Sequence, residues 1–192
     1  FGVTIYEHSP VWMQNLLVSA YGYSWKQRRL GGVFAEEYSK AKQRENFTAA
    51  QWLQYQQQQL QKILLHAFEQ VPFYKQQFLS KDLTAEKLKN ITPETISQLP
   101  VLSKEALRKY GTGLLLADKR EKDGSFFASS GSTGTPTQIL FSHAMHQRWF
   151  ALFELRVRNW AGVSSDIPRG MIGGRRIIPG ADNTPPFYRY NS

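Results

Sequence analysis

The sequence changes from helical to strand-like character within residues 124–141, which read GSFFASSGSTGTPTQILF. Two short runs, Ser125–Ala128 and Gln138–Phe141, are each predicted to form a strand, because they are apolar and bounded by turn-forming residues. The segment between them, residues 129–137, holds two glycines and several hydroxyl side chains, which are typical of a loop. Residues 124–141 therefore predict a strand, a glycine-rich loop and a second strand, with the relative direction of the strands left open.

Helical periodicity dominates the residues before Gly124. Apolar residues recur at helical spacing over residues 10–30, and two glycines then end the pattern. Thr48 is the predicted N-cap of a longer helix that runs to about Gln70 and stops at Pro72. Its predicted apolar stripe comprises Trp52, Leu53, Leu60, Ile63, Leu64, Ala67 and Val71. Its glutamines, Gln51, Gln54, Gln56 to Gln59 and Gln61, are predicted to lie mostly on a solvated face, the alternative being a polyglutamine interaction tract.

The remaining segments predict an α/β fold class. Short helices are predicted at residues 84–89 and 92–98, and another is predicted to start at Ser103 and end at Gly111. After the second strand, Ser142 is the predicted cap of a helix from His143 to about Trp160, and residues 170–173 predict a buried strand end. Strand, loop, strand, helix, strand is an order typical of an α/β layer. We therefore expect a mainly helical portion over residues 1–123 and an α/β portion over residues 124–192.

Composition excludes several classes of protein. The 192 residues are 41% hydrophobic, which is enough apolar material for one core of ordinary domain size. The absence of cysteine excludes disulfides, thiolate metal sites and cysteine nucleophiles, and it fits a reducing compartment. No apolar run reaches the roughly 18 residues that a membrane span needs, so we expect no membrane span. The formal net charge of +9 favours anionic ligands or partners without choosing among them.

The loop at residues 129–137 carries the main functional signal. Its glycines, Gly131 and Gly134, let backbone amides approach a ligand closely, and its hydroxyl groups add donors. Successive amides of such a loop can form an anion-binding nest suited to phosphate oxygens. Composition alone fits an ordinary solvated hairpin turn as well. The loop lacks the Gly-Lys-Ser/Thr ending of a Walker loop, which excludes a P-loop NTPase.

The order of residues from Ser129 to Pro136 resembles the phosphate-binding signature of the adenylate-forming superfamily, which includes acyl-CoA synthetases, luciferases and peptide-synthetase adenylation domains. Every position of that signature is met, although Thr135 stands where many members carry lysine. Flanking segments are similar to the phenylacetate-CoA ligase branch and, within it, to the capsular polysaccharide biosynthesis protein CapK group. These segments are residues 9–16, 21–22, 71–74, 99–104, 173–175 and 186–191.

The resemblance implies ATP-dependent activation of a small-molecule carboxylate to an acyl-adenylate, with pyrophosphate release and, in many members, transfer to a thiol such as coenzyme A. It implies ATP and Mg²⁺ as cofactors and, for the CapK group, a role in capsule or exopolysaccharide assembly. It further implies that residues 124–192 begin the α/β nucleotide-binding core of a large domain that also includes residues 1–123. By carry-over, the phosphate-binding residues are Ser129, Ser130, Gly131, Ser132, Thr133, Gly134 and Thr135. The catalytic residues of the family are expected beyond residue 192, so we expect an N-terminal fragment that is inactive alone.

Two further groups of residues are weaker candidates. His143 and His146 lie three apart on a predicted helix, a spacing compatible with one metal ion, but no carboxylate or thiol lies close in sequence. We therefore favour a solvent-facing or hydrogen-bonded pair and predict no metal site. Arg175, Arg176 and Arg189 are candidates for contact with an anionic substrate, or for ordinary pairing with other parts of the protein.

A competing hypothesis is a non-catalytic module. Its basic and aromatic composition would suit binding or scaffolding of an anionic polysaccharide or a nucleic acid. Residues 119–123, however, alternate in charge and are typical of a solvated loop, so we predict no nucleic-acid partner. A non-catalytic module also gives no reason for the glycine-rich signature between two predicted strands, and we therefore favour the ligase. The cytoplasmic location that we expect belongs to this ligase hypothesis.

Overall fold

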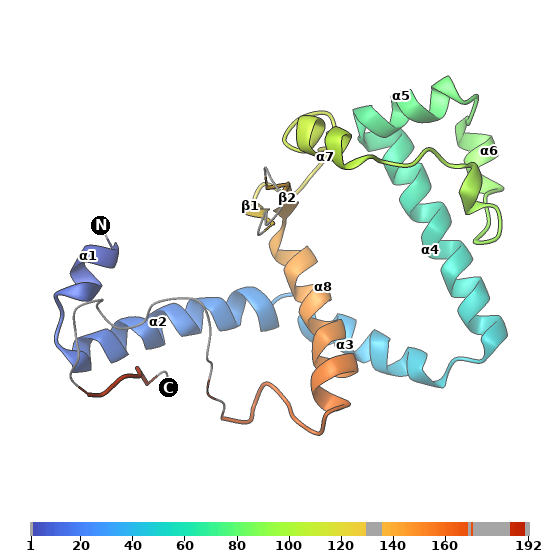
Figure 1. Cartoon of the computed structure of the whole chain (residues 1–192). Helices are drawn as coiled ribbons and strands as arrows, with labels where there is room; N and C mark the ends of the chain where they lie inside the picture. Colours follow the sequence, from blue (N-terminus) through green and yellow to red (C-terminus); the bar gives the residue numbers. More distant parts are fainter. Residues whose placement is uncertain (1, 130–135, 169, 171–184, 191–192) are drawn as a thin grey trace. The chain divides into compact units, whose positions relative to one another are not determined.

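The computed structural model describes residues 2–129, 136–168, 170 and 185–190 (Figure 1). Contacts divide the chain into two compact units, one made of residues 1–42 with 146–192 and the other of residues 43–145. The described part is mixed α/β, because it is mainly helical and also contains a two-stranded sheet. One boundary between the units follows Lys42, at the end of a helix, and the other falls in the first turn of a helix that begins at His143.

The unit of residues 1–42 and 146–192 is built from helices. They are α1 (Gly2–Glu7), α2 (Val11–Leu30), α3 (Phe34–Gln43), α8 (His143–Phe153) and a π-helical continuation, η3 (Glu154–Asn159). α2 confirms the helix predicted over residues 10–30. The chain turns after it at Gly32, whose φ of 51° suits glycine. A side chain at Gly32 would also collide with Gln147, whose Oε1 accepts the Val33 N–H at 3.1 Å.

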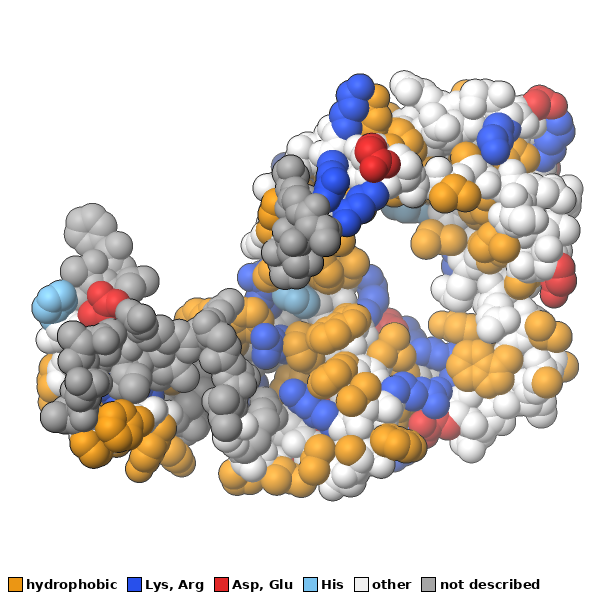
Figure 2. Space-filling view, in the orientation of Figure 1, with side chains coloured by type: hydrophobic (Ala, Val, Ile, Leu, Met, Phe, Trp, Pro, Cys, Tyr) orange, Lys and Arg blue, Asp and Glu red, His pale blue; other side chains and the backbone are white. Residues whose placement is uncertain are grey.

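α2 packs on α8 through a cluster of aromatic and cationic side chains. The guanidinium carbon of Arg29 lies 3.9 Å from the ring centroid of Trp25 and 4.6 Å from that of Phe150. Phe150 is buried, so part of the contact is shielded from water. A cation over an aromatic face is more favourable when it is shielded in this way. Figure 2 shows hydrophobic side chains on the surface over α8, where Trp149 is 51% and Leu152 46% exposed.

Glu154, at the start of η3, is a buried carboxylate with both oxygens engaged. Its Oε2 accepts a hydrogen bond from Arg158 Nη1 at 2.8 Å, and its Oε1 accepts one from Ser165 N at 2.6 Å. Burial raises the pKa of Glu154, but the hydrogen bonds and the charge of Arg158 together outweigh it, so the pKa lies below the ordinary value. The hydrogen bond from Ser165 therefore fastens the residues after η3 to the first residue of η3.

The unit of residues 43–145 contains a helical layer and a hairpin. Its helical segments are η1 (Arg44–Asn46), α4 (Ala49–Gln70), α5 (Pro72–Ser80), α6 (Ala85–Lys89), η2 (Ile96–Gln98) and α7 (Lys104–Tyr110). Thr48 caps α4 as predicted, in a capping box in which its Oγ1 accepts from Gln51 N at 3.3 Å. Ser103 caps α7 as predicted, and Thr84, which was predicted to be the first residue of its helix, caps α6. The helix predicted at residues 92–98 is wrong, because that stretch forms turns and only the three-residue η2.

The core of this unit lies where α5 and α6 pack on α4 (Figure 1). Its buried residues are Leu64, Phe78, Leu88 and Ile91, with Leu60 and Ala67 packed against them. Two residues of the predicted apolar stripe are misplaced, since Leu53 is 55% and Ile63 63% exposed. They stand on flanks of α4 that neither α5 nor α6 covers.

The predicted solvated face of glutamines is confirmed only in part. Gln54, Gln56, Gln58 and Gln59 are exposed. Gln57 Nε2, however, donates to the Ile91 carbonyl at 2.8 Å, and Gln61 Nε2 donates to the Lys89 carbonyl at 2.9 Å. These two glutamines satisfy carbonyls at the end of α6, and they are therefore part of the contact between α4 and α6.

Two further expectations concern a strand end at residues 170–173 and membrane-spanning helices. The strand end expected at residues 170–173 lies outside the described residues from Met171 onward, and Gly170 is exposed and outside any strand. Among the described helices, none is long and apolar enough to cross a membrane.

We predict that Leu64→Ala lowers the free energy of unfolding by about 2–5 kcal/mol, because it opens a cavity in the core. Gln58→Ala, on the exposed side of the same helix, is the matched control and should change it by less than about 0.5 kcal/mol. Gln57→Ala should lie between them, at about 1 kcal/mol, since it leaves the Ile91 carbonyl without its partner. Urea unfolding followed by circular dichroism measures all three. Equal losses from Leu64→Ala and Gln58→Ala would contradict this core.

We also predict that Glu154→Gln lowers the free energy of unfolding by about 1–3 kcal/mol at neutral pH. The substitution removes the negative charge that accepts hydrogen bonds from Arg158 Nη1 and Ser165 N. The pKa of Glu154 is below its ordinary value of 4.5, so this stability is present above pH 4.5 and is lost as the pH falls through the folded-state pKa. The difference between wild type and variant should therefore shrink in acid. Glu69→Gln, at an exposed position, is the control, and a difference that stays constant with pH would contradict the assignment.

Candidate functional site

The glycine-rich loop connects two antiparallel strands. β1 (Ser125–Ala128) pairs with β2 (Gln138–Phe141), and the register places Ser125 opposite Phe141 and Ala128 opposite Gln138. Both strands have the bounds that the sequence predicted, and the structure supplies their direction. Because the register continues by one residue, Ser129 lies opposite Thr137 at the base of the loop.

Ser129 and Thr137 close the base of the loop with three hydrogen bonds, and we call this pair the neck. Ser129 N donates to the Thr137 carbonyl at 2.9 Å. In return, Thr137 N and Thr137 Oγ1 both donate to Ser129 Oγ, each at 3.0 Å. Thr137 is only 8% exposed, so the neck is shielded on one side. The two ends of the segment between them are thus held at neighbouring positions of a sheet ladder.

Ser129 is the one predicted phosphate-binding residue that the structure describes. Its hydroxyl oxygen already accepts two hydrogen bonds within the neck, while its own hydrogen remains available for donation. The structure thus gives Ser129 a role in holding the loop. The other six, Ser130, Gly131, Ser132, Thr133, Gly134 and Thr135, lie outside the described residues, and phosphate binding by all seven stays a prediction.

Two glycines outside the loop position the hairpin. A Cβ added at Gly124 would lie 2.9 Å from Leu140 Cδ1, so a side chain there would push the residues before β1 away from β2. A Cβ at Gly111 would lie 3.3 Å from the Gln138 carbonyl, which places the end of α7 against β2. From the sequence, Gly124 was interpreted only as the point where helical character gives way to strand-like character, and Gly111 only as the end of a helix. A single sequence carries no signal for what packs against a glycine.

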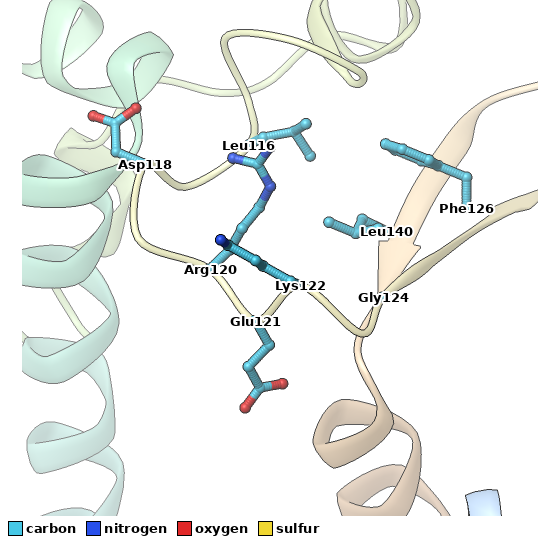
Figure 3. Close-up of a pocket in the computed structure, with 8 residues that line it drawn as sticks. All are labelled: Leu116, Asp118, Arg120, Glu121, Lys122, Gly124, Phe126 and Leu140. Atoms are coloured by element: carbon cyan, nitrogen blue, oxygen red, sulfur yellow. The ribbon is translucent and has the colours of Figure 1, made fainter.

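A pocket with a volume of about 390 Å³ lies beside the hairpin (Figure 3). It is lined by Leu116, Asp118, Arg120, Glu121, Lys122, Gly124, Phe126 and Leu140. Phe126 and Leu140 are directly paired across the strands, so their side chains share one face of the sheet. Sequence reasoning missed this pocket, because it interpreted residues 119–123 only as a solvated loop.

The two histidines have separate partners. His143 Nδ1 lies 3.1 Å from Asp123 Oδ2, and both side chains are nearly half exposed. His146 Nδ1 accepts a hydrogen bond from Arg28 Nε at 3.3 Å. Within the described ranges no group of three or more His, Cys, Asp and Glu side chains is placed to hold a metal ion. The antiparallel pairing of β1 with β2 explains why Asp123 contacts His143. It places the residues just before β1 beside the residues just after β2.

Arg189 is engaged in a partly buried polar cluster. It donates through Nε to Gln14 Oε1 and through Nη1 to the carbonyls of Pro186 and Tyr188, both at 2.8 Å. Gln14, which is 3% exposed, donates in turn to the Tyr6 carbonyl at 3.0 Å. The structure therefore favours ordinary pairing for Arg189, while Arg175 and Arg176 lie outside the described residues.

Comparison with known proteins supports the resemblance seen in the sequence. No protein-family model matches the chain. The chain is 26% identical to Protein CapK of Staphylococcus aureus over 187 residues, which cover 97% of this chain and 39% of that protein. It is 29% identical to Phenylacetate-coenzyme A ligase of Aromatoleum evansii over 102 residues, which cover 53% of this chain and 23% of the ligase.

These two matches confirm a distant relationship to CapK and to phenylacetate-coenzyme A ligase, and they support a ligase-like enzyme. The chain spans less than half the length of either relative.

We predict that Ser129→Ala opens the neck, because Thr137 loses the acceptor for two of its donors. The amide of Thr137 should exchange with deuterium roughly 5- to 100-fold faster, which corresponds to the loss of about 1–3 kcal/mol. Ser125→Ala, at an exposed position of the same strand, is the matched control and should leave the exchange rate unchanged. Equal exchange rates in Ser129→Ala and wild type would show that these bonds do not hold the loop.

Proposed function

We propose that the chain forms the N-terminal part of an ATP-dependent, AMP-forming ligase that activates a carboxylate as an acyl-adenylate. The observation that carries this proposal is the neck, which anchors both ends of a loop of glycines and hydroxyl residues in a strand pair. The distant similarity to a coenzyme A ligase supports the same class of enzyme. In this proposal residues 124–192 begin the nucleotide-binding core, and residues 1–123 are the helical portion of the same domain.

The loop would meet the main physical demand of the reaction, which is control of negative charge. A carboxylate and a triphosphate must be brought together, and charge then grows on the departing pyrophosphate. We assign the amides and hydroxyls of residues 130–135 to the β- and γ-phosphates, with Mg²⁺ supplying further positive charge there. Because Thr135 replaces a common lysine, the loop brings donors but no cation of its own.

The neck fits this role, because donors are most effective when they are held in place before charge develops. Its three hydrogen bonds hold both ends of the loop, so they reduce the entropy that ligand binding must remove. Coenzyme A is the acceptor that the similarity to a coenzyme A ligase suggests. Capsule or exopolysaccharide assembly is the pathway that the CapK resemblance suggests.

We predict that the full-length protein catalyses carboxylate-dependent exchange of pyrophosphate into ATP and that the isolated 192-residue chain does not. Thr133→Ala should lower the rate of pyrophosphate release roughly tenfold or more, the effect of losing one charge-assisted hydrogen bond. Gly134→Val should lower it further, because a β-branched residue disfavours the positive φ that we expect there. Thr112→Ala, an exposed threonine outside the loop, is the matched control.

Melting temperatures of all variants check that they are folded. Wild-type rates from folded Thr133→Ala and Gly134→Val would show that the loop is an ordinary hairpin connection. Release of ADP in place of AMP and pyrophosphate would contradict the proposed reaction. Robust exchange by the isolated chain would contradict the expectation that catalytic residues lie beyond residue 192.

A further inference from the structure

The pocket beside the hairpin has an apolar wall. Phe126 and Leu140 form one side of it from paired positions of β1 and β2, and Leu116 approaches from the segment before the hairpin (Figure 3). Phe126 is 46% exposed, so much of an aromatic ring remains for a ligand to cover. Burial of that surface would favour the apolar part of a small molecule.

Two cations lie in the same pocket. Arg120 Nη1 donates to the Ala117 carbonyl at 2.9 Å, which orients the guanidinium group and leaves most of its donors available. Lys122 extends from the same segment as Arg120 (Figure 3). Neither is in an ion pair with another described residue. Two positive side chains that are in no described ion pair favour an anion beside them.

The acidic residues of the pocket are directed elsewhere. The carboxylate of Glu121 points away from Arg120 and Lys122, and Asp118 lies on the side of α4, away from Phe126 and Leu140 (Figure 3). The N–H of Asp118 donates to the Gln70 carbonyl at 2.7 Å, which fixes that residue at the end of α4. The space between the two cations and the apolar wall is therefore without a carboxylate from the described lining.

The segment of residues 118–124, which carries both cations, is held at each end. The Asp118–Gln70 hydrogen bond holds one end, and the close packing of Gly124 on Leu140 holds the other. The contact of Asp123 Oδ2 with His143 Nδ1, at 3.1 Å, lies next to Gly124 and adds a second restraint there. A pocket with fixed walls loses less conformational entropy when a ligand binds.

We propose that this pocket binds a small organic anion, with its apolar body against Leu116, Phe126 and Leu140 and its head group on Arg120 and Lys122. A carboxylate and a phosphate monoester share this chemistry. Neither Ser129 nor Thr137 lines the pocket, and binding there requires no ATP, so this proposal does not depend on the proposed ligase activity.

Titration of the ¹⁵N-labelled chain, followed by NMR, tests this site with four probes. Hexanoate and hexyl phosphate carry the full chemistry, hexanamide keeps the apolar body without the charge, and inorganic phosphate keeps the charge without the body. We expect the first two to shift the amides of Gly124, Phe126 and Leu140 saturably, and the last two to bind roughly tenfold more weakly or worse. The tighter of the first two identifies the head group.

Variants separate this site from general attraction to a basic protein. Arg120→Gln combined with Lys122→Gln should weaken hexanoate binding roughly tenfold or more, whereas Lys119→Gln combined with Lys109→Gln, outside the pocket lining, should leave it within about twofold. Phe126→Ala should weaken it as well. If that variant disturbs the whole hairpin, Leu116→Ala tests the apolar wall in its place.

Three results would overturn the proposal. They are the absence of saturable shifts up to about 10 mM of either full probe, equal binding of hexanoate by wild type and the Arg120/Lys122 variant, and equal binding of hexanamide and hexanoate. Loss of binding in both double variants alike would show attraction to net charge only. None of these titrations contains ATP. Their failure would therefore contradict this pocket proposal without bearing on the pyrophosphate-exchange test of the proposed ligase activity.

Discussion

Antiparallel pairing of β1 with β2 is the constraint on which the candidate site depends. It places Ser129 opposite Thr137, and their three hydrogen bonds then hold both ends of the loop at one rung of the sheet. Closing a loop costs conformational entropy. Here the strands and the neck already hold the two ends of the loop together when the protein folds, before any ligand binds. The same pairing puts Phe126 and Leu140 on one face, where they form the wall of the pocket.

A two-stranded hairpin is marginal in water by itself, so its attachment to the helices matters. Gly111 brings the end of α7 against the Gln138 carbonyl, and Gly124 brings the preceding segment against Leu140. Further back, Phe73 N donates to the Leu114 carbonyl at 3.0 Å, which ties α5 to the residues after α7. The core of α4, α5 and α6 thereby supports the strands that present the loop.

Local features of the sequence predicted the local structure well. Both strands have the predicted bounds, and Thr48, Ser103 and Ser142 accept the predicted capping hydrogen bonds. A cap needs only a side chain and an amide three residues later, so one sequence contains all of it. The two strands that the glycine-rich segment joins were predicted for the same reason.

The features that sequence reasoning missed depend on partners far along the chain. Helical periodicity could not show that Leu53 and Ile63 face away from α5 and α6, or that Gln57 meets a carbonyl 34 residues later. The contact between Arg189 and Gln14 joins residues 175 positions apart. The pocket was missed because its charged residues look like a solvated loop until the hairpin supplies the apolar wall.

The most direct test of the central claim is whether the loop binds phosphate groups. The amide resonances of Gly131 and Gly134 can be followed by NMR while the ¹⁵N-labelled chain is titrated with tripolyphosphate and Mg²⁺, with sulfate as the control for general attraction to the charge of +9. We expect saturable shifts centred on these two amides with tripolyphosphate and much weaker shifts with sulfate. Equal shifts with both anions, or tripolyphosphate shifts confined to lysine and arginine surfaces elsewhere, would contradict it.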